Sequence, residues 1–206
     1  MYLSDRDLKW AIDCGRLKVN PKPTKIDPTS IDLHLDSVSE ARIWNIRAFH
    51  DDARIRGDPP GELRIGKFDY RKFSPEYLIP PPTDTSGLVF QRGHEIVVKP
   101  NGFILWQTKE TVGTPEEGAG LICFIDGKST KARTGLLVHL TAPNIHATWS
   151  GKITLEIANL GPFSFVLEED DVIAAITVAM VSSIPERSMQ EAGSVTYSQT
   201  NVSAST

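Results

Sequence analysis

Residues 126–161 read DGKSTKARTGLLVHLTAPNIHATWSGKITLEIANLG, and the rest of the chain is organised around them. It begins with a turn rich in hydroxyl groups and cations, and two runs typical of strands follow, Leu136–Ala142 and Lys152–Asn159. A single acid, Glu156, lies within the second run. Hydroxyls, cations and backbone amides at a Gly-led turn suit a phosphate, and a carboxylate within an apolar strand suits a general base. We therefore expect the turn and the acid to face one nucleotide.

Each of these features also has a plainer interpretation. A run such as 127–133 is most often a solvated turn between two strands. In the second strand the odd positions 153, 155 and 157 are large and apolar, while Thr154, Glu156 and Ala158 share the other face. If that face points outward, Glu156 is an ordinary surface acid; if it lines a cavity, Glu156 is suited to proton transfer. The sequence leaves both faces open.

The nearby ring residues are interpreted in the same way. His139 and His146 are most simply structural or exposed residues, because two isolated histidines do not make a metal site. Trp149 precedes Ser150-Gly151 and is more often a packing residue at a turn than a platform for a ligand.

The second half of the chain carries short apolar runs that turn signals separate. They lie at 88–91, 96–99, 103–107, 120–125, 136–141, 153–157, 163–167 and 172–181. Regular short strands with almost no helical periodicity predict an all-β fold, a barrel or a jelly roll. A short helix from Ser4 to Gly15 and a half-buried strand at 31–35 come before them.

Two segments fall outside this pattern. Residues 48–86 are rich in charge, Pro and Gly, and we expect short strands or an insertion there. Residues 188–206 are polar and contain no Lys or Arg, which predicts a mobile C-terminal tail after one domain of residues 1–187.

Composition excludes several classes of partner. The 206 residues are 40% hydrophobic and 23% charged, with a net charge of −4, so a broad basic surface for nucleic acid is not expected. No run approaches the length of a membrane span, and the N-terminus has no signal-peptide core, which together predict a cytoplasmic protein without a membrane partner. Cys14 and Cys123 are far apart in the sequence; a single disulfide between them is one alternative, and two reduced thiols are the expectation for a cytoplasmic protein.

Common catalytic patterns are also missing from the sequence. There is no His-x-Glu followed by Pro-Cys-x-x-Cys, so the ligands of the zinc deaminases are absent, and no Cys/His set has the spacing of a structural zinc site. The chain has no P-loop, no dinucleotide-binding fingerprint and no nucleophile elbow. We therefore predict no metal ligands, and the 126–161 stretch remains the main indication of function.

That stretch carries a family resemblance. The run GKSTKARTGLLVHLTA, the turn ending in WSG and the following KITLE are similar, in order and spacing, to the motifs of the dCTP deaminases of the dUTPase-like superfamily. The N-terminal MYLSDRDLKWAIDCGRLKVNPKP and the strand SIDLHL also resemble that family. The similarity extends through most of residues 1–183 and weakens in 48–86.

The resemblance implies a fold and a reaction. The fold is a mainly β, dUTPase-like barrel or distorted jelly roll with a short N-terminal helix, assembled as a homotrimer with active sites at the subunit interfaces. The reaction is the zinc-independent hydrolysis of dCTP to dUTP and ammonia, with Mg²⁺ carried by the triphosphate. Feedback inhibition by dTTP is common in the family, so dTTP is a further candidate ligand.

The resemblance also implies roles for individual residues. Glu156 matches the glutamate that activates water for attack on C4 of cytosine, and Arg133 and Ser129 match the pair that orders the water and the nucleotide. Ser129 and Thr130 also match positions near the phosphates, and Ala142 matches the position whose backbone reads the base. The further candidates for substrate binding are Lys128, His146, Trp149, Tyr197 and Gln199.

The chain departs from the family pattern at three places. Lys128 stands where the family usually has Arg, which keeps the charge but loses the bidentate fork. His146 stands where the family has Asp in its IDPGWSG turn, and loss of that acid argues against cleavage of the triphosphate. The tail keeps Tyr197 and Gln199 but lacks the Lys and the spacing of the family's closing segment.

These departures keep two alternatives open. The first is a deaminase with changed specificity, which acts on a modified cytosine nucleotide or a monophosphate. The second is a nucleotide-binding regulator without catalysis, although retention of Glu156 and Arg133 favours an enzyme.

Overall fold

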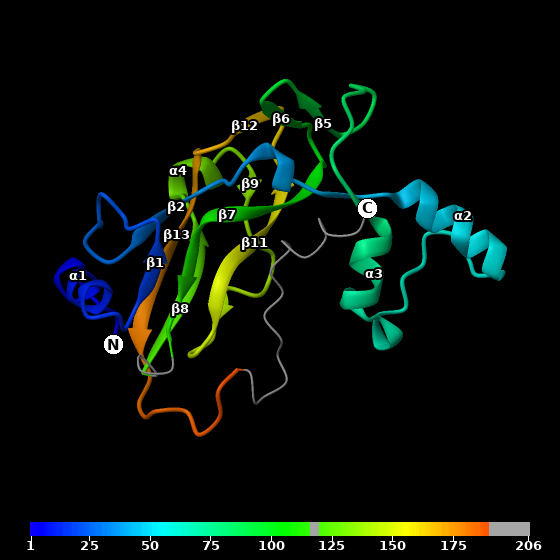
Figure 1. Cartoon of the computed structure of the whole chain (residues 1–206). Helices are drawn as coiled ribbons and strands as arrows, with labels where there is room; N and C mark the ends of the chain where they lie inside the picture. Colours follow the sequence, from blue (N-terminus) through cyan, green and yellow to red (C-terminus); the bar gives the residue numbers. More distant parts are fainter. Residues whose placement is uncertain (116–119, 190–206) are drawn as a thin grey trace.

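The computed structural model describes residues 1–115 and 120–189, and two four-stranded antiparallel sheets form its body (Figure 1). One sheet has the order β1-β7-β11-β9 and the other the order β10-β8-β13-β2. The strands of the first sheet are β1 (Lys18–Asn20), β7 (Phe103–Gly113), β11 (Ser150–Asn159) and β9 (Leu136–Leu137). Those of the second are β10 (Asn144–Ile145), β8 (Leu121–Gly127), β13 (Val172–Met180) and β2 (Ile31–His34). The expectation of a mainly β fold is confirmed.

The core lies between these strands and follows from their alternation. On β11 the odd positions Ile153, Leu155 and Ile157 are buried, as the two-residue period of a strand predicts. They join a single hydrophobic cluster with residues of β7 and β13, including Trp106 and Ile176, both fully buried. Burial of so many large apolar side chains supplies the main favourable term for folding.

Two small sheets complete the β-structure. The first has the order β12-β6-β5, with β12 (Phe165–Glu168), β6 (Glu95–Val98) and β5 (Val89–Arg92). The second pairs β3 (Ile43–Trp44) with β4 (Leu78–Ile79). The three-stranded sheet lies at one end of the molecule, at the top of Figure 1. These strands coincide closely with the predicted runs at 88–91, 96–99 and 163–167.

The N-terminal helix forms where the sequence predicts it. Helix α1 (Asp5–Asp13) follows Ser4, whose backbone N and Oγ both donate to Oδ2 of Asp7, at 3.4 and 2.8 Å. This contact is a capping box, and the acids in the first turn favour the positive end of the helix. Leu8 and Ala11 are the buried residues of the helix and belong to the core.

The segment 48–86, expected to hold short strands or an insertion, contains two helices as well as β4. Helix α2 (Ile46–Arg56) is capped by Asn45, which accepts from the amide of Ala48 at 3.1 Å, and it ends at Gly57 with φ 76°. A 3₁₀ turn (Ile65–Lys67) leads to α3 (Tyr70–Tyr77), which Asp69 caps. A second 3₁₀ turn (Val38–Glu40) lies before β3. Figure 1 shows α2 and α3 projecting away from the two main sheets.

An aromatic cluster holds these two helices together. The ring of Phe73 lies 4.6 Å from that of Tyr77, 5.1 Å from Phe68 and 5.5 Å from Phe49, measured between centroids. The ring of Trp44, on β3, lies 5.4 Å from Phe73. The insertion therefore has a small apolar centre of its own, and its helical period was hidden by the charged residues between the aromatic positions.

Two other predictions concern the ends and surfaces of the chain. No helix in the described residues is long and apolar enough to cross a membrane. The predicted tail begins at residue 188, and its residues 190–206 lie outside the described part of the chain.

Candidate active site

The carboxylate of Glu156 lies in a pocket of about 210 Å³ next to β11. Its side chain is half-buried, and Oε2 accepts a hydrogen bond of 3.2 Å from the backbone amide of Leu140. Thr154, two residues earlier on the same face of the strand, also lines the pocket. The packing of the odd positions into the core thus directs the even face of β11 toward a cavity.

Three other predicted residues lie in the same pocket. Ala142, His146 and Trp149, from the segment that leads into β11, line it with Glu156. Trp149 also packs against the hydrophobic core, so it is both a packing residue and a wall of the pocket. Other cavities, of about 250 and 340 Å³ at the helical insertion, contain none of the predicted site residues.

The prediction of a strand over Leu136–Ala142 is wrong beyond its first two residues. Only Leu136 and Leu137 pair in a ladder, as β9 against Asn159 and Ala158 of β11. Farther along, the amide of Leu140 donates to the side chain of Glu156 instead of to a neighbouring strand. The segment therefore leaves the sheet in order to build the wall of the pocket.

The predicted phosphate turn forms one helical turn, α4 (Ser129–Ala132), directly after β8. Ser129, Thr130 and Arg133 are exposed, and none of them lines the pocket of Glu156. Lys128 forms an ion pair with Asp32, and the ammonium of Lys131 donates to the carbonyl of Val172. The two lysines therefore have partners within the chain, whereas the hydroxyls of the turn face outward.

Strand register separates the turn from the acid within one chain. Asn159 pairs with Leu136, and the amide of Leu160 donates to the carbonyl of Gly135 at 2.9 Å. Asn159 lies about 10 Å along the strand from Glu156 at the usual rise per residue, and Arg133 lies farther away, beyond the end of β11. A single chain does not bring the predicted acid and the predicted arginine into one pocket.

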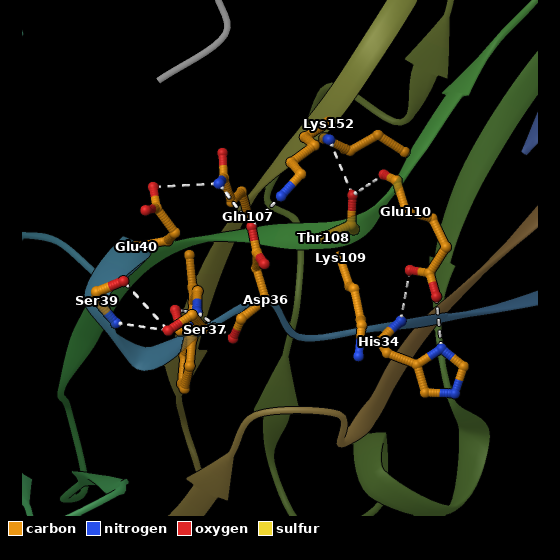
Figure 2. Close-up of polar contacts among 12 residues, drawn as sticks. His34, Asp36, Ser37, Ser39, Glu40, Gln107, Thr108, Lys109, Glu110 and Lys152 are labelled. Atoms are coloured by element: carbon orange, nitrogen blue, oxygen red, sulfur yellow. Dashed lines mark hydrogen bonds and ion pairs between the residues drawn. The ribbon is translucent and has the colours of Figure 1, made fainter. Parts of the chain in front are cut away.

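An irregularity in the pairing of β7 with β11 lies next to Ile153, which lines the pocket. Lys152 pairs with Thr111 and Thr154 with Gln107, so three residues of β7 lie opposite the single Ile153. Thr108 stabilises this bulge, because its Oγ1 accepts from the amide of Ile153 at 3.0 Å and donates to the carbonyl of Glu110 at 2.9 Å. Figure 2 shows Thr108 between two sets of polar side chains. Glu110 contacts His34 on one side, and Gln107 contacts Asp36 and Glu40 on the other.

Comparison with known proteins identifies the family. The family model described as "DCD: dCTP deaminase-like" matches residues 2–181. The chain belongs to the dCTP deaminase-like family. A dCTP deaminase, dUMP-forming, of Corynebacterium kroppenstedtii is 31% identical over 90% of this chain and 85% of its own length. A dCTP deaminase of Marinomonas sp. is 29% identical over 96% of this chain and 92% of its own.

The fold of the dCTP deaminase-like family is also recognisable in three dimensions. The crystal structure of 2′-deoxycytidine 5′-triphosphate deaminase from Agrobacterium tumefaciens superposes with a TM-score of 0.55 at 15% identity. The match covers 87% of this chain and 48% of that chain. At this identity the likeness establishes the fold alone.

The sequence did not identify several residues that line the pocket of Glu156. His139 lines it, and its Nδ1 is buried without a hydrogen-bond partner among the described residues, whereas its Nε2 lies 3.9 Å from Asp126. Lys152, Asn144 and Met189 line it as well. Lys152 lies four residues before Glu156 on the same face of β11, and this separation was the one sequence signal that could have identified Lys152. Tyr197 and Gln199 lie outside the described residues.

Across residues 1–115 and 120–189 no group of three or more His, Cys, Asp or Glu side chains could hold a metal ion. Cys14 is exposed and Cys123 is buried, and both are free. Burial raises the pKa of the Cys123 thiol to about 12, because the thiolate would lose its hydration there.

Proposed function

We propose that this chain hydrolyses dCTP to dUTP and ammonia, with Glu156 as the general base. The observation that carries the proposal is the half-buried carboxylate of Glu156, held by the Leu140 amide in a pocket with Ala142 and His146. The names of the curated relatives support dCTP as the substrate, since both forms of enzyme named among them are dCTP deaminases.

The chemistry requires one group that accepts and then returns protons. Glu156 takes a proton from water, and the hydroxide oxygen bonds to C4 of cytosine to give a tetrahedral intermediate. Glu156 delivers this proton to N3 and then transfers the proton of the new C4 hydroxyl to the amino group, so that the C4–N bond breaks and ammonia leaves as C4 becomes a carbonyl. One carboxylate can serve as base and then as acid because it is restored at the end of each cycle.

Arg133 and Ser129 are proposed to come from a neighbouring copy of the chain in a homotrimer. Two observations support this arrangement: they are exposed, and they lie outside the pocket that holds Glu156. A guanidinium from the adjacent subunit would stabilise the charge that develops in the transition state. Ser129, Thr130 and Lys128 would then face the phosphates, with Mg²⁺ arriving on the triphosphate as part of the substrate.

The product is proposed to be dUTP and not dUMP. Relatives of both kinds exist, since some are named dUMP-forming and one is named dCTP deaminase without that addition. His146, which lines the pocket, stands where an acid is expected in enzymes that also cleave the triphosphate. The substitution removes the acid that would activate the second water. A cytoplasmic location is also proposed, because Cys14 and Cys123 are free thiols, as is usual in a reducing compartment.

The test is to incubate the purified chain with dCTP, CTP and dCMP in the presence of Mg²⁺, and to measure ammonia and separate the nucleotides by chromatography. We expect ammonia and dUTP in equal amounts from dCTP, and a loss of about a thousandfold in Glu156→Gln. The matched control is Glu168→Gln, which alters an exposed acid on β12. Tight binding of dCTP without ammonia release would overturn the proposal, and dUMP as the product would overturn its final step.

A further inference from the structure

The pocket of Glu156 carries a second charged side chain that the proposed reaction does not use. Lys152 lies four residues before Glu156 on β11 and lines the same pocket. Extended chain of this length separates two side chains by about 13 Å, which is close to the length of a nucleoside with its first phosphate. The pocket therefore has polar groups at two ends.

The wall of the pocket runs antiparallel to β11, from the Glu156 end to the Lys152 end. Leu140 contacts Glu156 through its amide, and Ala142 follows it along the wall. His146 and Trp149 come next and lead directly into β11, whose first residues include Lys152. A base held at the Glu156 end would thus direct its sugar and phosphate toward His146 and Lys152.

Lys152 is held in place by a network on the face of the sheet (Figure 2). Its ammonium forms an ion pair with Asp36, whose Oδ2 also accepts from Nε2 of Gln107 at 2.7 Å. The same Nε2 lies 3.2 Å from Oε2 of Glu40. Gln107 is only 1% exposed, and the side chains of Lys152 and Asp36 are 28% and 14% exposed. The lysine is thus partly buried and fixed before any ligand arrives.

The backbone of Asp36 is fixed just as firmly. Its amide donates to the carbonyl of Gln107 at 3.1 Å, and its carbonyl accepts from Nε1 of the buried Trp106 at 3.1 Å. The bulge at residues 108–110 of β7 shifts the register between β7 and β11 directly after Lys152, which pairs with Thr111. The position of the ammonium is therefore set by the sheet itself.

The ammonium of Lys152 has three donors, and within the described residues Asp36 is its hydrogen-bond acceptor. Its remaining donors are available to a ligand in the pocket. We propose that Lys152, positioned by Asp36, binds an acceptor oxygen on the sugar or first phosphate of the nucleotide and so determines which cytosine compounds bind. This inference rests on the proposed nucleotide pocket, but not on turnover.

Preorganisation is the physical reason for a specific effect. A free lysine loses side-chain entropy when it binds a ligand, whereas Lys152 has already lost it to Asp36. A charged donor held in a partly buried site contributes more than an exposed one, because water competes less for the ligand.

The test measures equilibrium binding in a Glu156→Gln background, so that it does not depend on catalysis. Dissociation constants for deoxycytidine, dCMP and dCTP are determined by calorimetry with and without Lys152→Met. We expect Lys152→Met to weaken binding at least about tenfold. Equal weakening for all three compounds indicates a sugar oxygen, and weakening confined to dCMP and dCTP indicates a phosphate oxygen.

Two variants separate this role from a structural one. Lys152→Arg keeps a positive donor and should restore most of the binding, and Lys109→Met removes a comparable but more exposed ion pair, with Asp170, and should leave binding unchanged. Unchanged dissociation constants in Lys152→Met would overturn the inference. Equal weakening in Lys152→Arg and Lys152→Met would also overturn it, because the donor would then have no part. Wild-type protein that binds the nucleotides but releases no ammonia would contradict the proposed function alone.

Discussion

Gly135 and Gly161 lie in direct backbone contact at the junction between α4 and the end of β11. A Cβ on Gly135 would lie 2.3 Å from the backbone N of Gly161, and a Cβ on Gly161 would lie 1.9 Å from the carbonyl O of Thr134. Gly135 also has φ +95°, a conformation that other residues rarely adopt. The contact fixes the hydroxyl turn beyond the end of the strand that carries Glu156.

Gly135→Ala is therefore expected to lower the free energy of unfolding by about 3 kcal/mol, because backbone strain and a backbone clash add together. The measurement is urea denaturation. Gly93→Ala is the matched control, since Gly93 also has positive φ but no atom within 4 Å of the added Cβ, and it should cost only about 1 kcal/mol. Equal losses in the two variants would show that the close contact has no energetic effect.

The bulge in β7 leads to a second prediction. Thr108 is fully buried, and its hydroxyl accepts from Ile153 and donates to Glu110. Thr108→Val keeps the shape but leaves a buried amide and a buried carbonyl without this partner, so we expect a loss of about 2 kcal/mol in urea denaturation. Thr108→Ser keeps the hydroxyl and should lose clearly less. A valine variant as stable as the wild type would mean that water or a shifted backbone replaces the hydroxyl.

The helical insertion is expected to unfold separately from the sheets. Phe73 contacts three other rings of the insertion and Trp44, so Phe73→Ala should weaken α2 and α3 by about 2 kcal/mol. Hydrogen exchange should show faster amides in α2 and α3, with protection in β7 and β13 unchanged. Phe163→Ala, at a side chain that is 64% exposed, is the control. Faster exchange throughout the sheets would contradict a separate apolar centre.

The cysteines give a prediction about pH. Burial raises the pKa of Cys123 to about 12, so its reactive thiolate is nearly absent at pH 8 and increases only as the pH approaches that value. Iodoacetamide at pH 8 should modify Cys14 in the folded protein and both cysteines after unfolding, as read by mass spectrometry. Rapid modification of Cys123 in the folded protein would contradict its burial.

Much of the fold was predictable because strand alternation is local. The runs at 103–107, 153–157 and 172–181 all became strands, and Ser4 marked the start of the first helix correctly. The helices of residues 46–77 were not foreseen, since their apolar positions come together only through the contacts among Phe49, Phe73 and Trp44. Tertiary contacts, rather than local pattern, decide such a segment.

The candidate site was predictable in its residue types but not in its geometry. The sequence could not tell which face of β11 holds Glu156, because that depends on which face packs against the second sheet. It also predicted a strand to Ala142, whereas the segment turns away at Leu140 to contact the acid. Lys152 was missed because its partner Asp36 lies 116 residues away in the chain.

Glu156 of one subunit and Arg133 of another are proposed to deaminate dCTP together. Glu156→Gln and Arg133→Gln, each expected to be inactive alone, are unfolded together, refolded as mixed oligomers and assayed for ammonia release from dCTP. A shared site predicts about one quarter of the wild-type rate, since half of the chains carry each intact group. A mixture as inactive as its two components, beside an active wild type refolded in the same way, would contradict the claim.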